Sequence, residues 1–384
     1  MENKPQLVIV LSRFPYPLEK GDKLRSYYQI KELSKLHSIH LIALSDVAVA
    51  DSSKEELNKF CSSVTVHHLS KISIAFNSFL ALLGNKPIQV GYFYNFSIHQ
   101  KIKKQLIEIR PDHIFSQLIR TTEYTKNYLS CPKTLDYMDA LSKGMERRIE
   151  KASWFSKWFF KMEYKRLRHY ERVMFDYFDK KTIISKQDKQ FIFHPERNEI
   201  VCIPNGIDVH FLESIVVDQD YDFSFVGNMN YPPNIEAVEF IATNILPHFP
   251  TAKLLVAGAN PHPKLEKLAK SNRNITISGW VDDIRTSYVR SKIFLAPMQT
   301  GTGMQNKLLE AMALGVPCLT TPLANNAIGA LHEHSIMVAN EIPEMIQLLS
   351  RLLEDEQLRQ DIGSNGKQFV EKNYSWTKAT QELI

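Results

Sequence analysis

The sequence predicts an α/β protein built from two doubly wound domains, each a parallel β-sheet covered by helices. The chain has 384 residues, and this length favours two domains of roughly 150–200 residues over one. Short apolar runs alternate with longer helical patterns almost throughout, which is typical of parallel sheets with helices on both faces. Turn residues at Pro204 and Asn205–Gly206 interrupt the alternation, so we expect a linker at about 204–220.

The individual elements follow from these patterns on either side of the break. Before it, strands are predicted at Gln6–Leu11, Ile39–Leu44, Val64–Leu69, His113–Leu118, Thr134–Met138 and Lys181–Ile184, with helices at Lys23–Leu36 and along Lys143–Phe178. After it, strands are predicted at Phe223–Val226, Lys253–Ala257, Ile275–Ser278, Ile293–Ala296 and Cys318–Thr320, with helices at Pro233–Leu246 and Ser375–Ile384. Two such domains place a ligand at the carboxyl ends of their strands, in the cleft between them.

The composition excludes several classes of protein. Hydrophobic residues make up 44% and charged residues 23% of the chain, as in soluble globular proteins. The net charge of +5 favours anionic partners. The four cysteines form no CxxC pair and the histidines show no metal-ligand spacing, so we expect no metal and a reducing compartment. The N-terminal apolar run is too short for a signal peptide and no apolar stretch spans a membrane. We therefore expect a cytoplasmic protein.

The most informative segment is a loop with Gly301 and Gly303 before a helix predicted at Met304–Leu314. Glycines before a helix let backbone N–H groups approach a ligand, and the positive end of the helix dipole suits a diphosphate. Lys307 and Glu310 share one face of this helix. A cation near phosphates and a carboxylate accepting sugar hydroxyls suit a nucleotide. The spacing alone also allows a plain turn and a surface ion pair between Lys307 and Glu310.

This segment and several others, in the same order, resemble glycosyltransferase family 4, and within it bacterial exopolysaccharide-associated sugar transferases. The further stretches are Pro204-Asn-Gly-Ile-Asp208, Phe225-Val-Gly-Asn-Met229 with Pro233-Asn234, Val256-Ala-Gly-Ala259, Ser278-Gly-Trp-Val-Asp-Asp-Ile284 and Tyr374-Ser-Trp376, and, in the N-terminal half, Ser12-Arg-Phe-Pro-Tyr-Pro17 and Leu135-Asp-Tyr-Met-Asp139. The resemblance implies the GT-B fold, in which two Rossmann-like domains face each other across a cleft. It assigns residues 1–203 to the acceptor side and 221–372 to the nucleotide-sugar donor, with 373–384 packing back on the first domain.

The resemblance also implies a donor site. Glu310 matches the family's second glutamate, which binds the ribose hydroxyls of the nucleotide. Trp280 and Val281 lie where members bracket the nucleobase, although Trp280 is equally consistent with a core aromatic. The remaining donor-binding positions follow the strand ends and open the glycine loop: Gly21, Gly227, Asn228, Gly301, Thr302, Gly303, Met304, Gln305 and Lys307.

The sequence departs from the family pattern at two places. Thr302 occupies the position of the family's first glutamate, which contacts the transferred sugar. Asn228 stands where many members carry an arginine that neutralises the leaving diphosphate, and the following Tyr231-Pro-Pro-Asn234 lacks their lysine. Lys307 is our candidate to replace part of this charge.

Two regions of the N-terminal half bear on the acceptor. The long loop from Ser12 to Asp22 contains Gly21, which resembles the family's glycine facing the diphosphate; the alternative is an irregular turn with Asp22 as helix N-cap. Asp136 and Asp139 follow a strand and are expected to face the cleft. Asp139 is a candidate catalytic residue that orients an acceptor hydroxyl or the donor sugar, or it merely caps the next helix. A retaining transferase needs no strong protein base if the leaving phosphate takes the acceptor proton.

The predicted helix from Arg147 to Lys181 interleaves five aromatic residues at 154–160 with many Lys and Arg residues. Such a helix is typical of a membrane-surface element, which would suit a lipid-linked acceptor at the inner membrane face. The alternative is a packing helix with its aromatic residues inward. No nucleic-acid-binding motif accompanies the charge, so we expect no nucleic acid partner.

Together these features predict a retaining, metal-independent hexosyltransferase that needs no cofactor besides its nucleoside diphosphate sugar. The acceptor is expected to be a glycan or lipid-linked saccharide in exopolysaccharide or cell-surface polysaccharide biosynthesis. Two alternatives stay open. One is a nucleotide-sugar-binding subunit without catalysis, suggested by Thr302 and Asn228. The other is a nucleotide-sugar epimerase on the same fold.

Overall fold

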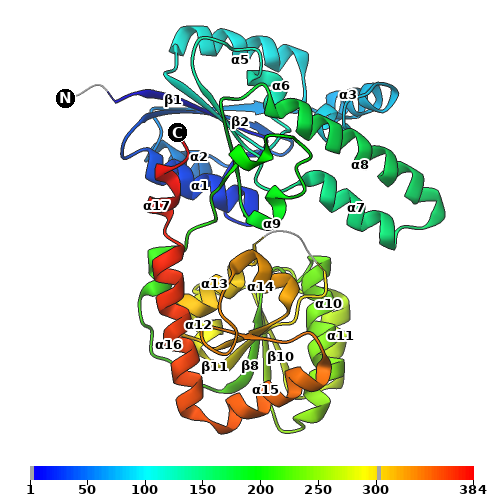
Figure 1. Ribbon diagram of the computed structural model, residues 1–384, viewed down its shortest axis with the longest axis vertical. Coiled ribbons are helices and arrows are strands. Elements are labelled where there is room, and N and C mark those ends of the chain that lie inside the picture. The colour runs from blue at the N-terminus through cyan, green and yellow to red at the C-terminus, as the bar shows by residue number, and fades with distance from the viewer. Residues whose placement is uncertain (1–3, 301–303) are drawn as a thin grey trace. The chain divides into compact units, whose positions relative to one another are not determined.

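The computed structural model describes residues 4–300 and 304–384, which form two compact units (Figure 1). The first unit contains the chain up to Pro204 together with Trp376–Ile384, and the second contains Asn205–Ser375. From Asn205 onward, the stretch expected as a linker therefore belongs to the second unit. It is held there by Ile207, whose backbone N–H donates to the Tyr374 carbonyl at 2.8 Å.

Both units are built on parallel sheets covered by helices, which confirms the predicted fold class. The sheet of the first unit has the strand order β3-β2-β1-β4-β5-β6-β7 among the described residues. Its strands are β1 (Gln6–Leu11), β2 (Ser38–Ser45), β3 (Ser63–His68), β4 (His113–Gln117), β5 (Lys133–Asp136), β6 (Lys180–Ile183) and β7 (Val201–Cys202). In register, Ile9 lies beside Leu41 of β2 and Phe115 of β4. Helices cover both faces of such a sheet, which explains the near-continuous apolar runs of its central strands.

The helices of the first unit connect these strands and cover the sheet. They are α1 (Gly21–Leu33), α2 (Asp51–Asn58), α3 (Lys71–Leu83), α4 (Ile88–Phe93), α5 (Phe96–Ile109), α6 (Thr122–Thr125), α7 (Leu141–Lys151), α8 (Trp154–Phe175), α9 (Lys186–Lys189), the 3-10 turn η1 (Arg197–Glu199) and α17 (Trp376–Gln381). The single helical segment predicted at 143–178 is thus two helices. Ala152 and Ser153 adopt extended backbone conformations between them, and this breaks the run without glycine or proline.

The aromatic residues of α8 do not all face inward. Trp154 is 76% and Trp158 68% exposed, so the prediction of a packing helix with buried aromatics is wrong for these two. Phe160, by contrast, packs against the core of the first unit. No helix among residues 4–300 and 304–384 is both long and apolar enough to cross a membrane.

The last residues of the chain complete the first unit. Trp376 of α17 stacks on Tyr28 of α1 with ring centroids 5.2 Å apart. The Thr134 hydroxyl on β5 donates to the Leu383 carbonyl at 3.0 Å, and Leu383 is fully buried in the core under α1 and β1. The terminal helix is therefore an integral part of this unit.

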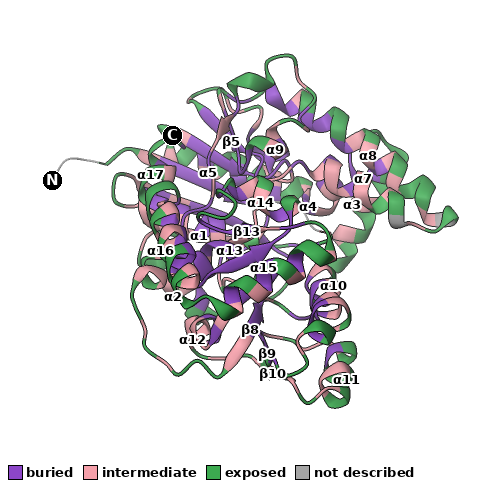
Figure 2. Cartoon of the chain, turned by 60° about the horizontal axis from the view of Figure 1, so that its bottom comes forward, coloured by how far each residue is buried: buried purple, intermediate pink, exposed green. Residues whose placement is uncertain are grey.

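The second unit has its own sheet, with the order β10-β9-β8-β11-β12-β13 in the described residues. The strands are β8 (Tyr221–Val226), β9 (Leu254–Ala257), β10 (Ile275–Gly279), β11 (Ser291–Ala296), β12 (Cys318–Thr320) and β13 (Met337–Val338). The helices are η2 (Val209–Leu212), α10 (Pro232–Phe240), the π-turn η3 (Ile241–Ile245), η4 (Leu246–His248), α11 (Pro263–Ser271), α12 (Ile284–Val289), α13 (Asn306–Ala313), α14 (Pro322–Ile328), α15 (Ile342–Glu354) and α16 (Glu356–Asn373). Buried residues lie along the strands and the inward faces of the helices, as Figure 2 shows.

Candidate functional site

The strand order of the second sheet singles out one position for a ligand. β8 lies between β9 and β11, so the chain runs outward from β8 in both directions and the order reverses between β8 and β11. In open parallel sheets, ligands bind outside the carboxyl ends of the strands at this switch point. The predicted residues Gly227 and Asn228 directly follow β8, and the segment leading to α13 follows β11.

The turn after β8 packs backbone against backbone. A Cβ atom on Gly258 would lie 1.8 Å from the Gly227 carbonyl oxygen, and Gly258 has φ +134°. A Cβ atom on Gly227 would lie 2.7 Å from the Asn234 amide nitrogen. Gly258 therefore requires glycine, whereas a side chain at Gly227 would have to displace the end of the Asn234 side chain. The close approach of Gly258 to Gly227 brings the turns after β8 and β9 into direct contact at the carboxyl edge of the sheet.

Lys307 reaches the same turn from the first residues of α13. Its Nζ donates a hydrogen bond to Asn234 Oδ1 and lies 4.5 Å from the centroid of the Phe225 ring. The Asn234 amide in turn donates to the Asn228 carbonyl at 2.8 Å. Burial lowers the pKa of Lys307 to about 7, although the Glu310 charge opposes this shift. Asn228, Asn234 and Lys307 are therefore connected by hydrogen bonds beside Gly227.

Glu310 lies one helical turn after Lys307 and has a different partner. The Tyr288 hydroxyl of α12 donates to Glu310 Oε2 at 2.5 Å. Burial raises the pKa of Glu310, while the Tyr288 hydrogen bond and Lys307 oppose the rise. Because the Lys307 ammonium bonds Asn234 and Glu310 bonds Tyr288, the alternative of a surface ion pair between them is wrong.

The other predicted donor positions are distributed along the same edge. Trp280 and Val281 follow the edge strand β10, and Trp280 is 70% exposed, so the core-aromatic interpretation is wrong. Met304 and Gln305 precede α13, which begins at Asn306 rather than at Met304. Gly301, Thr302 and Gly303 lie outside the described residues.

Gly21 and Asp139 belong to the first unit. α1 begins at Gly21, and a Cβ atom there would meet the Met138 Cε at 3.6 Å, so the start of α1 lies beside the segment that carries Asp139. Asp22 is not the N-cap, which is Lys20; its carboxylate pairs with Arg13 at 2.6 Å.

Asp139 and Asp136 have different environments. Asp136 is fully buried and accepts from the Arg25 Nε at 2.7 Å, so the expectation that it faces a ligand is wrong. Asp139 caps no helix, since Ala140 is the N-cap of α7. Burial, reinforced by the nearby Asp188 charge, raises the pKa of Asp139 to about 7. Of the two carboxyl groups, Asp139 is the one poised to exchange a proton near neutral pH.

One important residue of this site, Tyr288, is not predicted by the sequence. Tyr288 carries no sequence signal, because it lies 22 positions before Glu310 on a short helix whose apolar pattern marks it only as a core residue. Asn234 appeared only as part of a motif, without a role. Within residues 4–300 and 304–384, no group of three or more His, Cys, Asp or Glu side chains is placed to hold a metal ion.

Comparisons with known proteins agree with this geometry. Residues 220–355 match the family described as Glycosyl transferases group 1. A 44.6 kDa protein of the cps region of Klebsiella pneumoniae is 23% identical over 402 residues, covering 99% of each chain. The capsular polysaccharide biosynthesis glycosyltransferase CapM of Staphylococcus aureus is 30% identical over 118 residues, covering 29% of this chain and 30% of that protein.

Solved structures of similar architecture span nearly the whole chain. Sucrose-phosphate synthase from Thermosynechococcus elongatus superposes with a TM-score of 0.70 at 13% identity, covering 98% of this chain and 97% of that chain. HepE of Anabaena, in complex with UDP, gives 0.69 at 12% identity over 98% of each chain. WaaG, a glycosyltransferase involved in lipopolysaccharide biosynthesis, gives 0.68 at 14% identity over 98% of this chain and 99% of that chain.

The fold and the family match agree with each other. The two Rossmann-like units have the GT-B fold of the solved structures named above, and residues 220–355 form a glycosyl transferases group 1 domain. This confirms the resemblance inferred from the sequence motifs. Lys307, Glu310 and Tyr288 all lie within the matched domain.

Proposed function

We propose that this chain is a retaining glycosyltransferase that transfers a sugar from a nucleoside diphosphate sugar to a glycan or lipid-linked saccharide. The observation that carries the proposal is the position of Lys307 and Glu310, which lie on consecutive turns of α13 at the switch point of the second sheet. A cation beside the glycine turn suits the diphosphate, and a carboxylate one turn further suits the ribose hydroxyls. HepE has the same fold, and its structure was solved in complex with UDP. This supports a nucleotide donor for the present chain.

The relatives support a role in cell-surface polysaccharide synthesis. The Klebsiella protein, which this chain matches over its full length, comes from a cps region. CapM takes its name from capsular polysaccharide biosynthesis. We therefore place the acceptor among the growing saccharides of such a polymer.

The chemistry we propose needs no metal. Lys307, held against the turn after β8, stabilises the negative charge that develops on the leaving diphosphate. A leaving phosphate oxygen takes the proton of the acceptor hydroxyl, so transfer with retention requires no strong protein base. Asp139, with a pKa raised to about 7, orients the acceptor hydroxyl or the donor sugar.

A thermal-shift panel tests the donor site. UDP, GDP, ADP, dTDP and CMP are each added to the wild type, to Glu310→Ala and to Glu354→Ala, which removes an exposed carboxylate of α15. At a hundred times its dissociation constant, a ligand adds about 2.7 kcal/mol of stability. We expect one diphosphate to stabilise the wild type and Glu354→Ala but not Glu310→Ala. Stabilisation of all three proteins alike would remove Glu310 from the site.

Activity assays with the nucleotide sugar that corresponds to this diphosphate distinguish an enzyme from a binding subunit. A chain that binds the diphosphate, yet neither hydrolyses nor transfers the sugar of the matching nucleotide sugar with any saccharide, would be a binding subunit. Thr302, in place of the family's glutamate, makes this the relevant second candidate. Inversion of the 2-hydroxyl without transfer would instead indicate an epimerase.

Binding of the diphosphate is expected to weaken as the pH rises through about 7. Lys307 has a pKa lowered to about 7, so its ammonium is charged below this pH and attracts the anion, and it becomes neutral above. Above about pH 7 the affinity for the diphosphate should fall by up to about tenfold per pH unit. The fall ends at the pKa that Lys307 has in the complex. Titration calorimetry between about pH 6 and pH 9 measures this.

Two variants isolate the contribution of Lys307. Lys307→Ala should bind weakly at every pH, and its affinity should lack the fall above neutrality. Lys264→Ala is the matched control, because the Lys264 side chain is 66% exposed on α11. A similar loss of affinity in both variants would show that Lys307 does not contact the phosphates.

A further inference from the structure

The first unit contains a pocket at its own switch point. The strand order reverses between β1 and β4, and Arg13 and Arg120 follow the carboxyl ends of these two adjacent strands. Together with side chains of α4, α7 and α8 they line a pocket of about 290 Å³. Such a position is where ligands bind in open parallel sheets, and nothing in the donor site described above uses it.

Arg120 forms no ion pair with a carboxylate in the part of the chain that the structure describes, although the charges of Asp22 and Asp139 act on it. One guanidinium nitrogen, Nη2, donates to the neutral Gln89 Oε1 at 2.7 Å, while Nε is buried and has no hydrogen-bond partner among the described residues. Burial, reinforced by the Arg13 charge, lowers the pKa of Arg120 to about 10. An unpaired buried charge is costly, so an anion bound beside it would be stabilised.

The acidic group in the pocket is already engaged. Glu163 of α8 accepts from the backbone N–H groups of Ile88 and Gln89 at 2.9 and 3.1 Å. Its carboxylate therefore holds the start of α4 rather than Arg120. Arg13 and Arg120 both lie beside Phe93, with guanidinium carbons 5.9 and 5.4 Å from the centroid of its ring. Arg13 also pairs with Asp22 through one nitrogen, Nη1.

The other side of the pocket is apolar and leads to an exposed apolar surface. Phe159 of α8 lines the pocket and is 36% exposed, and Trp158 beside it is largely exposed. Arg166, further along α8, donates to the carbonyls of Ala81 and Leu82, so α3 lies against α8 (Figure 1). On α3, which packs against α8, several large apolar side chains are also exposed: Ile72, Phe76, Phe79, Leu80, Leu82 and Leu83. Patches of this kind mark contact with apolar partners.

We propose that this pocket binds the phosphate of a lipid-linked acceptor, with Arg120 and Arg13 holding the oxyanion and the apolar surface of α8 and α3 receiving the lipid chain. The pocket matches both halves of such a molecule: two guanidinium groups in its lining for the phosphate and aromatic and aliphatic side chains for the chain. The inference rests on the proposed glycosyltransferase function and deepens it, because it names the chemical class of the acceptor.

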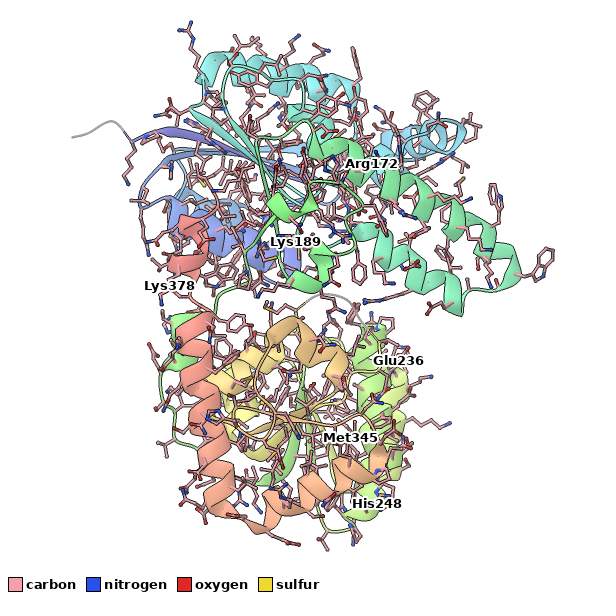
Figure 3. All side chains as sticks on the ribbon, in the orientation of Figure 1. Arg172, Lys189, Glu236, His248, Met345 and Lys378 are labelled. Atoms are coloured by element: carbon pink, nitrogen blue, oxygen red, sulfur yellow. The ribbon has the colours of Figure 1, made fainter. Side chains whose placement is uncertain are left out.

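The test compares two probes that differ only in the phosphate. Farnesyl phosphate and farnesol are titrated, below their aggregation concentrations, into the full-length wild type and three variants. Arg120→Gln and Arg13→Gln each remove one pocket cation. Arg172→Gln removes the same charge from an exposed position of α8 that does not line the pocket (Figure 3). We expect the wild type and Arg172→Gln to bind the phosphate about tenfold or more tightly than the alcohol, which corresponds to one charge-assisted hydrogen bond.

The two pocket variants are expected to lose this preference. Arg13 has a side chain that is 31% exposed, so Arg13→Gln gives a result even if Arg120→Gln fails to fold. Equal binding of farnesol and farnesyl phosphate by the wild type would overturn the proposal, and so would an undiminished preference in Arg13→Gln together with any folded Arg120→Gln. Arginine-dependent binding of a methyl glucuronide but not of farnesyl phosphate would overturn the lipid carrier and assign the pocket to a sugar carboxylate.

Nucleotide stabilisation, measured on the same samples, separates this proposal from the donor site. The pocket variants should retain the stabilisation by the nucleoside diphosphate, because Lys307 and Glu310, the two residues on which the proposed donor site rests, lie in the other unit. If no nucleotide stabilises any sample while the phosphate preference persists, the proposed function fails and the anion pocket stands. If nucleotides bind and the preference is absent, the pocket proposal alone fails.

Discussion

Replacing Arg25 by alanine is expected to lower the free energy of unfolding by about 3–5 kcal/mol. Arg25 and Asp136 are both completely buried, and their side chains pair at 2.7 Å. Removing the cation leaves the carboxylate in the interior, where the Gln29 amide and the Met138 N–H remain as donors. Chemical denaturation at neutral pH measures the loss. Arg172→Ala, at an exposed position, should change the free energy by less than about 0.5 kcal/mol.

Two further measurements identify the cause of this loss. In the wild type the pKa of Asp136 is lowered, and the Arg25 charge and hydrogen bond contribute to this lowering. Its contribution to stability is therefore present above the ordinary pKa and is lost as the pH falls. Arg25→Ala should forfeit that contribution, so its deficit relative to the wild type should shrink as the pH falls below about 4, the ordinary pKa of an aspartate. The double variant Arg25→Met/Asp136→Leu should recover a large part of the loss, since apolar pairs of similar volume replace buried ion pairs well. A pH-independent deficit would point to lost packing instead.

Gly258→Ala is expected to destabilise the second unit by about 3 kcal/mol or more. The new Cβ would lie 1.8 Å from the Gly227 carbonyl oxygen, and φ at Gly258 is +134°, where side chains are strained. The strands β8 and β9 would have to separate at the end where the donor site lies, so nucleotide binding should weaken as well. Thermal unfolding with and without the stabilising diphosphate measures both effects.

Gly144→Ala is the matched control for this prediction. Gly144 lies within α7, and a Cβ atom there would meet nothing within 4 Å. Alanine has the higher helix propensity by about 1 kcal/mol, so this variant should be neutral or more stable than the wild type. A similar loss in both variants would show that the contact between Gly258 and Gly227 is not the cause.

The fold was accessible from the sequence where the residue pattern is local. Strands such as Gln6–Leu11 are nearly continuous apolar runs. Gly315 and Pro317, just after α13, mark the end of that helix. Local patterns failed where a short interaction depends on distant residues. β13 has only two residues, Met337 and Val338, and exists because it pairs with β12. The break between α7 and α8 at Ala152–Ser153 has no glycine or proline to mark it.

The same division applies to the candidate site. The spacing of Lys307 and Glu310 placed both on one helix, and this is correct. Their partners, Asn234 and Tyr288, come from other helices and were not predicted. For the aspartates, the sequence predicts that both Asp136 and Asp139 face the cleft, with Asp139 as the catalytic candidate. Only the packing of Arg25, 111 positions away, shows that Asp136 is structural.

The closing helix α17 has a consequence for how this protein is made. The first unit needs Trp376–Ile384, which lie beyond the whole second unit in the chain. During synthesis these residues leave the ribosome after the whole second unit, so the first unit cannot stack Tyr28 on Trp376 until then. For the same reason, one cut after Pro204 does not yield two equivalent halves: the C-terminal piece would carry away a segment that belongs to its neighbour. A separately expressed first unit would need those nine residues supplied as a peptide or grafted after residue 204.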